Sequence, residues 1–341
     1  MNQIKGDAVI RCEGVWKIFG RRAKEAYAAV RRDGLTKTQI RDRFDCVVGV
    51  RDASFEVHRG EIFCIMGLSG SGKSTLIRHI NRLIEPTAGA IFIDGQDVNG
   101  LSQAELRKVR AEKIGMVFQN MALMPHRTVL DNVAFSQEVR GHEVKARQDT
   151  ARRAIAAVDL AGWETRYPDE LSGGMQQRVG LARAFATEAP ILLMDEPFSA
   201  LDPLIRTRLQ DELLELQAKT QRTIIFVSHD LDEAFKLGNR IALMEGGRIV
   251  QIGTARDIIA NPVSEYVADF VAHMNPLGVL TAADVVQPGP AAEDLGDDPV
   301  PRDMPVREVM GLLADRTALP VQGGGCITRD AVLARLIDPR G

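Results

Sequence analysis

The stretch EIFCIMGLSGSGKSTLIRHI, residues 61–80, contains a complete phosphate-binding loop. Its central part, GLSGSGKST, matches the pattern G-x-x-x-x-G-K-[ST], with a predicted buried strand before it and a predicted helix after it. The glycines allow backbone N–H groups to converge on phosphate oxygens, and the start of the helix adds a positive partial charge. We expect Lys73 to reach the terminal phosphates and the Ser74 hydroxyl to bind Mg²⁺. The predicted phosphate site comprises Gly67, Leu68, Ser69, Gly70, Ser71, Gly72, Lys73, Ser74 and Thr75.

Two further apolar runs end in carboxylate or imidazole side chains that can bind metal or transfer protons. ILLMDE (191–196) and TIIFVSH (223–229) are short and continuous, as expected of strands buried on both faces of a parallel sheet. Ligands of such sheets bind at the carboxyl ends of the strands, so both runs should end at the edge that carries the phosphate loop. There we expect Asp195 to hold Mg²⁺, Glu196 to polarise an attacking water, and His229 to contact the γ-phosphate.

The bulk composition excludes several classes of protein. Lys and Arg total 43 and Asp and Glu 46, a net charge of −3, which gives no support to a nucleic-acid partner recognised by charge. Four scattered cysteines without a CxxC pair predict reduced thiols in a cytosolic protein. The N-terminus lacks the pattern of a secretory signal, and no apolar run approaches the roughly 18 residues of a membrane helix. A role at a membrane must therefore come through another chain.

An insertion at residues 21–47 interrupts the predicted N-terminal strands. Helical spacing of apolar residues, the Asp33-Gly34 stop and Thr36 as an N-cap predict two short amphipathic helices. Their charged faces could be solvated or could form a docking surface, and the sequence leaves both interpretations open.

Local signals divide the rest of the chain. Ser102 and Glu105 form a predicted capping box, and residues 120–170 are predicted to be mostly helical. Asp202-Pro203 predicts a helix start, and IALMEGGRIVQIG predicts a hairpin. The acidic, proline-rich stretch 287–305 predicts a linker, and the sequence after it predicts a strand, a glycine turn, a strand and a helix.

The stretch LSGGMQQR, residues 171–178, is a second glycine-rich loop before a predicted helix, although the chain already has a phosphate loop. With it, the chain resembles the ATPase subunits of ABC transporters over about residues 8–255. The motifs that carry this resemblance are Phe19 of KIFG, GLSGSGKST, Gln119 of MVFQN, LSGGMQQR, ILLMDEP, SALD at 199–202 and His229.

The resemblance implies an α/β fold: a P-loop ATPase core with a mainly parallel sheet, an antiparallel β subdomain and a helical subdomain at about 120–180. This core would occupy residues 1–275. Residues 276–341 resemble part of a small α+β regulatory module of the cystathionine-β-synthase type, and one such piece within a chain puts a complete regulatory pair in doubt.

The resemblance also assigns roles to the motif residues. Phe19 is implied to stack on the adenine of ATP, and Gln119 to contact Mg²⁺ and the attacking water. Two copies of the chain would lie head to tail, so that each ATP contacts the signature loop of the partner. Asp202 would link the two sites, and the signature contacts are expected from Ser172, Gly173 and Gly174.

Three features resemble importers of quaternary amines and other compatible solutes (glycine betaine, proline betaine, choline or proline): the insertion, the sequence around the phosphate loop and the segment FQNMALMPHRTVLDNVAF. That subfamily implies integral membrane permease subunits as partners, a solute-binding protein indirectly, and a peripheral location on the cytoplasmic face of the inner membrane. Two alternatives remain open at this point: an importer ATPase for another small solute such as an amino acid, and a soluble ABC mechanoenzyme. The second is disfavoured because the chain has one cassette, no long coiled-coil insertion and no basic charge.

Overall fold

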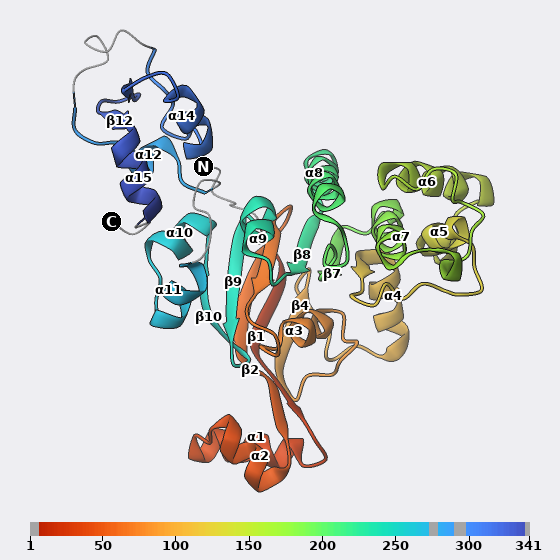
Figure 1. Ribbon diagram of the computed structural model, residues 1–341. Coiled ribbons are helices and arrows are strands. Elements are labelled where there is room, and N and C mark those ends of the chain that lie inside the picture. Colours follow the sequence, from red (N-terminus) through yellow and green to blue (C-terminus); the bar gives the residue numbers. More distant parts are fainter. Residues whose placement is uncertain (1–6, 273–278, 290–297, 338–341) are drawn as a thin grey trace. The chain divides into compact units, whose positions relative to one another are not determined.

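The computed structural model describes residues 7–272, 279–289 and 298–337 (Figure 1). The chain forms two compact units, the first from residues 1–229 and 242–249 and the second from residues 230–241 and 250–341. The predicted division at 275/276 falls within residues 273–278, outside the described part, and remains a prediction.

A six-stranded sheet lies mostly in the first unit. Its order is β10-β9-β3-β8-β7-β6, and β3 (Ile62–Met66), β8 (Thr223–Val227), β7 (Ile191–Asp195) and β6 (Ile114–Val117) run parallel to one another. Every residue of β3, β7 and β8 is buried, which confirms the prediction of strands covered on both faces. Adjacent to β3 lies the predicted hairpin of β9 (Arg240–Glu245) and β10 (Arg248–Gly253). The carboxyl ends of β3, β7 and β8 therefore meet at one edge.

Helices follow the strands and start at the caps that the sequence indicates. Ser102 and Glu105 form the predicted capping box, and Asp202 caps its helix ahead of Pro203. The helices α5, α6 and α7 pack against one another and form the predicted helical subdomain (Figure 1). The helices of this part are α3 (Lys73–Ile80), α4 (Gln103–Lys113), α5 (Val129–Val139), α6 (Val144–Ala157), the 3-10 turn η1 (Pro168–Glu170), α7 (Gly173–Ala186) and α8 (Pro203–Thr220).

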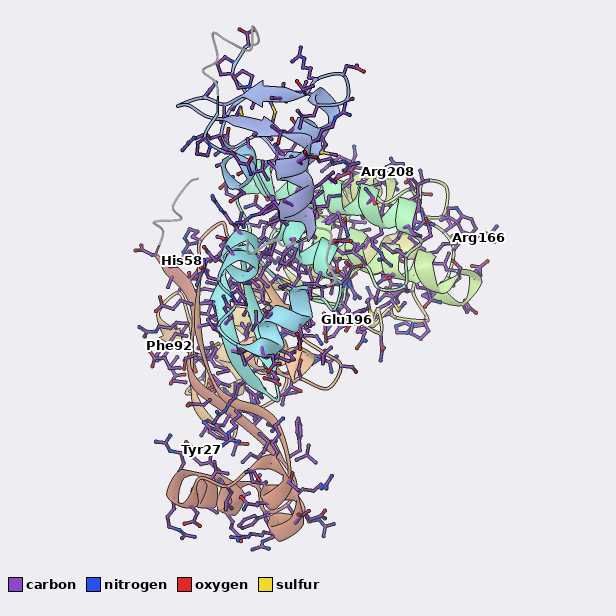
Figure 2. All side chains as sticks on the ribbon, turned by 60° about the vertical axis from the view of Figure 1, so that its left-hand side comes forward. Tyr27, His58, Phe92, Arg166, Glu196 and Arg208 are labelled. Carbon is purple, nitrogen blue, oxygen red and sulfur yellow. The ribbon has the colours of Figure 1, made fainter. Side chains whose placement is uncertain are left out.

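A second, antiparallel sheet has the order β2-β1-β4-β5, with β1 (Ala8–Phe19), β2 (Val47–His58), β4 (Ala88–Ile93) and β5 (Gln96–Asp97). The predicted insertion forms α1 (Ala23–Asp33) and α2 (Lys37–Phe44), which lie at the far end of the long β1 and β2 strands (Figure 1). Their apolar faces share a core with Trp16, whose ring meets Tyr27 edge-on at 5.4 Å; Tyr27 is labelled in Figure 2. Trp16 is therefore a packing residue of this core.

The second unit contains a small core of its own, built from apolar side chains between Leu280 and Val332. The predicted strand, glycine turn, strand and helix appear as β11, β12 and α15. Residues 290–297 of the predicted linker lie outside the described part. On either side of them, Gln287 forms an antiparallel backbone bridge with Cys326, and Val300 is buried in this core. The elements are α9 (Leu231–Leu237), α10 (Ala255–Ala260), α11 (Glu265–Val271), α12 (Ala282–Val285), α14 (Val306–Leu312), β11 (Ala318–Pro320), β12 (Cys326–Thr328) and α15 (Arg329–Ile337).

Across the described ranges, every helix is too short or too polar to cross a bilayer.

Candidate active site

The phosphate loop connects β3 to α3 and requires glycine for steric reasons. Gly67 and Gly72 have φ angles of 144° and 99°, which other residues rarely adopt. A Cβ atom would lie 2.1 Å from the Met244 carbonyl oxygen at position 67, and 2.1 Å from the Gly49 carbonyl oxygen at position 72. The loop is thus wedged between β9 and β2, and its backbone N–H groups are held where the sequence predicts a phosphate.

Lys73 is buried at the start of α3. Its ammonium donates hydrogen bonds to the carbonyl oxygens of Gly67 at 2.7 Å and Leu68 at 3.0 Å. Burial lowers the pKa of the Lys73 ammonium, although the nearby carboxylates of Glu196 and Asp195 act in the opposite direction. A phosphate would supply the negative charge that stabilises the protonated form, so this lysine fits an anion at the loop.

Asp195, the last residue of β7, is fully buried. The guanidinium of Arg78 donates two hydrogen bonds to its Oδ2, at 3.1 and 2.8 Å. The other oxygen, Oδ1, is buried without a hydrogen-bond partner among the described residues. Such an oxygen costs free energy unless it finds a donor or a cation. The unpaired oxygen therefore fits the predicted Mg²⁺ shell. Among the described residues, no group of three or more His, Cys, Asp or Glu is arranged to hold a metal ion by itself.

Glu196 lies between the two other predicted catalytic residues and is labelled in Figure 2. Gln119 Nε2 donates to Glu196 Oε2 at 3.1 Å, and His229 Nδ1 lies 3.4 Å from Glu196 Oε1. The Glu196 side chain is about one-sixth exposed and that of His229 is 60% exposed, so the carboxylate faces an accessible space. Three residues from distant parts of the sequence thus meet where the strands end, and a carboxylate in this position can accept a proton from water.

Phe19 ends β1 with 40% of its surface exposed, and its ring packs on Gly49 of β2. A Cβ at Gly49 would lie 2.7 Å from the ring and 3.7 Å from a methyl carbon of Thr75. The aromatic ring and the first turn of α3 therefore flank the same glycine. An exposed ring beside the phosphate loop is suited to stacking on a base.

The signature residues are the N-terminal end of α7. Ser172 is the N-cap, and its hydroxyl accepts a hydrogen bond from the Met175 N–H at 3.3 Å. Gly173 and Gly174 form the first turn, which leaves backbone N–H groups free to bind an anion. Asp202 caps α8 through the Ile205 N–H at 3.1 Å.

Two residues with a role in this geometry were missed by the motif analysis. Arg78 follows Ser74 by one helical turn on α3, so its helical spacing could have placed it beside the phosphate site. Gln177 is buried and donates a hydrogen bond to the backbone carbonyl oxygen of Glu196, and only its place within LSGGMQQR gave a signal.

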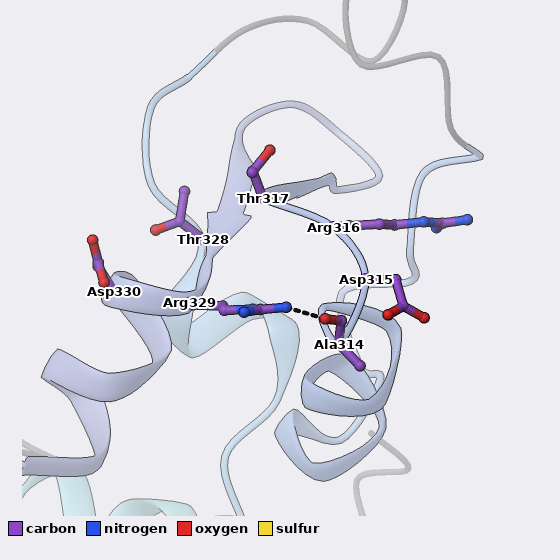
Figure 3. A pocket seen from close by; sticks show the side chains of 7 residues that line it. All are labelled: Ala314, Asp315, Arg316, Thr317, Thr328, Arg329 and Asp330. Atoms are coloured by element: carbon purple, nitrogen blue, oxygen red, sulfur yellow. Dashed lines mark hydrogen bonds between the residues drawn. The ribbon is translucent and has the colours of Figure 1, made fainter.

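A separate pocket of about 600 Å³ lies in the second unit (Figure 3). Its wall includes Thr317, Thr328 and Asp330, and the guanidinium of Arg329 is turned to the carbonyl oxygens of Leu313 and Ala314. None of the predicted site residues lines this pocket.

The sequence matches the ABC transporter family over residues 50–199. The glycine betaine/proline betaine transport system ATP-binding protein ProV of Escherichia coli K12 is 53% identical over 281 residues, which cover 82% of this chain and 70% of that protein. The chain belongs to the ABC transporter family.

Other ABC proteins extend the comparison. The glycine betaine transport ATP-binding protein OpuAA of Bacillus subtilis is 53% identical, over 86% of this chain and 69% of its own. The trimethylamine N-oxide transport system ATP-binding protein TmoW of Ruegeria pomeroyi is 46% identical, over 94% of this chain and 93% of its own. A dimeric structure of the ATP-binding cassette MJ0796 with ADP and Pi has a TM-score of 0.63 at 30% identity, covering 72% of this chain and 98% of that chain. The predicted P-loop ATPase fold and ATP-binding family are confirmed.

Proposed function

We propose that this ABC ATPase is the energy-coupling subunit of an importer for quaternary amines or related compatible solutes. The names of the relatives support this class, since they include glycine betaine, proline betaine, choline and trimethylamine N-oxide transport proteins. The partners we propose are a second copy of this chain, integral membrane permease subunits and, indirectly, a solute-binding protein. The chain would work as a peripheral subunit on the cytoplasmic face of the membrane.

The observation that carries the catalytic proposal is the position of Glu196 between Gln119 and His229. In this proposal Glu196 accepts a proton from the attacking water, and Gln119 orients that water. His229 contacts the γ-phosphate, and Lys73 with the backbone of the loop neutralises its charge.

Mg²⁺ would be held by Ser74, Gln119 and Asp195, and the unpaired buried oxygen of Asp195 supports this assignment. When bound, it would stabilise the charge that develops on the β- and γ-phosphates. The ion pair with Arg78 fixes the direction of the other, unpaired oxygen of Asp195.

Switching follows from the shared nucleotide. Ser172 and Gly174 of one copy would close on the γ-phosphate held by Lys73 of the other, so ATP binding favours the closed dimer. Hydrolysis removes the shared group and allows the copies to separate, and the permease would follow this cycle.

Affinity purification from detergent-solubilised membranes tests the proposal. We expect a permease to copurify and ATP hydrolysis to be enhanced in that complex. Uptake of labelled glycine betaine, choline and an amino acid by cells that lack this chain then separates the solute classes. Recovery of the chain without a membrane partner, or uptake loss confined to an amino acid other than proline, would contradict the proposed class.

A further inference from the structure

The buried side chain of Gln177 joins the signature helix to the backbone of the catalytic residue. Gln177 lies in the second turn of α7 and is only 2% exposed. Its Nε2 donates a hydrogen bond to the carbonyl oxygen of Glu196 at 3.1 Å. Its Oε1 accepts a hydrogen bond from the Ala200 N–H at 2.8 Å, two residues before Asp202.

The two partners leave the amide only one orientation. The Glu196 carbonyl can only accept and the Ala200 N–H can only donate, so the amide must present nitrogen to the first and oxygen to the second. A methionine side chain has a similar shape but provides neither a hydrogen-bond donor nor a strong acceptor. An ionised glutamate provides only the acceptor. Because the site is buried, loss of the acceptor costs the Ala200 N–H its hydrogen bond to Gln177, and loss of the donor removes one hydrogen bond from the Glu196 carbonyl.

The contact bears on a residue in an unusual backbone conformation. Glu196 has a φ angle of 50°, in the left-handed region that non-glycine residues seldom adopt. Its carbonyl also accepts hydrogen bonds from the hydroxyl and the N–H of Ser199, at 3.1 and 3.4 Å. The direction of this carbonyl and the direction of the side chain depend on the same Cα, so holding the carbonyl also aims the carboxylate.

The same helix holds the loop after Gln119. Arg183 donates hydrogen bonds to the carbonyl oxygens of Met121 at 2.7 Å and Ala122 at 3.0 Å. Both of these residues have positive φ angles, 52° and 47°. Thus α7 supports both loops whose side chains, Gln119 and Glu196, bond to each other.

We propose that Gln177 is a positioning residue that links the signature end of α7 to Glu196 of its own chain. This inference rests on the proposed function, in which Ser172 binds the ATP held by the partner copy. When Ser172 binds that ATP, the same helix also positions the Glu196 carboxylate, which acts on the ATP held by its own chain. Because its two side-chain hydrogen bonds go to backbone groups of Glu196 and Ala200, Gln177 acts through these residues.

The test compares Gln177→Met with Gln137→Met in the purified full chain. Gln137 is an equally buried glutamine, on α5, whose Nε2 donates to the Ala186 carbonyl at the other end of α7. We expect Gln177→Met to lower kcat about 10- to 100-fold, because small displacements of a reacting group cost that much, while KM for ATP stays within about twofold. Gln137→Met should show a similar change in Tm and keep its kcat.

A third variant tests whether the hydrogen bond that Gln177 donates to the Glu196 carbonyl is required. Gln177→Glu should be slow at high pH, where the introduced carboxylate faces the Glu196 carbonyl. Protonation of that carboxyl restores a donor to Glu196 while its other oxygen still accepts from Ala200, and burial raises its pKa. We therefore expect the ratio of its kcat to that of the wild type to rise as pH falls from about 8.5 to about 6.

A Gln177→Met kcat within twofold of the wild type, or no lower than that of Gln137→Met, would overturn the inference. A pH-independent ratio for Gln177→Glu would overturn the assignment of the donor. A wild-type chain without ATPase activity would instead refute the proposed function, so the two failures are distinct.

Discussion

Adjacent carboxylates of this site differ in burial and partners. Asp195 is fully buried and bonded to Arg78, whereas Glu196, the next residue, leaves the strand through a left-handed backbone turn toward Gln119 and His229. Two neighbouring residues thus differ in function: an oxygen of Asp195 is suited to bind a cation, and the carboxylate of Glu196 is suited to accept a proton. Single substitutions should therefore separate binding from turnover.

We expect Glu196→Gln to bind ATP but to lose at least about 100-fold in kcat, because the amide cannot accept a proton from water. Retained ATP should accumulate in a dimer, measurable by size exclusion with light scattering. Glu215→Gln is the matched control, since Glu215 is an exposed partner of Lys219 on α8. Hydrolysis by Glu196→Gln at the wild-type rate would remove this residue from its assigned role.

His79 predicts a pH dependence of stability. It is fully buried, its Nδ1–H donates to the Ile84 carbonyl at 2.6 Å, and burial lowers its pKa from 6.5 to about 4. Between pH 6.5 and 4, His79 is protonated in the unfolded chain but remains neutral in the folded chain. The folded state therefore has its full stability above pH 6.5 and loses stability as the pH falls toward 4.

The expected loss across that range is about 3 kcal/mol in the free energy of unfolding, measured by urea titration at several pH values. The variant His79→Asn keeps a donor for Ile84 but has no imidazole to protonate, and its stability should depend less on pH over the same range. Equal pH dependence of the two proteins would show that His79 does not contribute it.

Among the elements, the phosphate loop has the tightest steric requirement. Gly72→Ala would place its Cβ 2.1 Å from the Gly49 carbonyl oxygen, at a φ of 99°. Gly70→Ala is the control, because Gly70 has a φ of 76° but no atom within 4 Å of the Cβ position. We expect the Gly72 variant to lose at least about 2 kcal/mol more than the Gly70 variant, in unfolding measured without nucleotide. Equal losses would show that the close approach of β2 has no energetic role.

At the scale of the whole molecule, the question is whether each nucleotide site uses two copies. The dimeric MJ0796 cassette has the same fold at 30% identity. In this chain Lys73 is buried in the phosphate loop and Ser172 caps α7, a separate element. A mixture of two inactive variants can decide whether these two elements serve the same nucleotide from one chain or from two.

We expect Lys73→Ala and Ser172→Arg to be inactive alone and to recover activity when mixed. A mixed dimer pairs the intact loop of one chain with the intact signature of the other, giving one complete site. With random pairing, half of the dimers contain one of two sites, so about a quarter of wild-type ATPase activity is the upper limit. Nucleotide binding by Ser172→Arg alone is the control for folding, and a mixture as inactive as its parts would contradict sites shared between copies.

Much of the fold follows from local signals in the sequence. The glycines and Lys73 of the phosphate loop, the caps at Thr36, Ser102 and Asp202, and the apolar runs of β3, β7 and β8 all act within a few residues. Sterics and short-range hydrogen bonds decide such features, so the order of strands, loops and helices could be predicted. The meeting of Asp195, His229 and the loop at one edge follows from the rule for parallel sheets.

Tertiary packing alone decides which side chains meet across long separations. Arg78 pairs with Asp195 over 117 residues, Gln119 with Glu196 over 77, and Gln177 with the Glu196 backbone over 19. Such contacts depend on how far each helix is rotated and how each strand is registered against its neighbours. No local pattern encodes that geometry, because it arises from the closest packing of the whole core. For this reason the motifs identified the candidate catalytic residues, whereas their long-range hydrogen-bond partners became visible only in the folded chain.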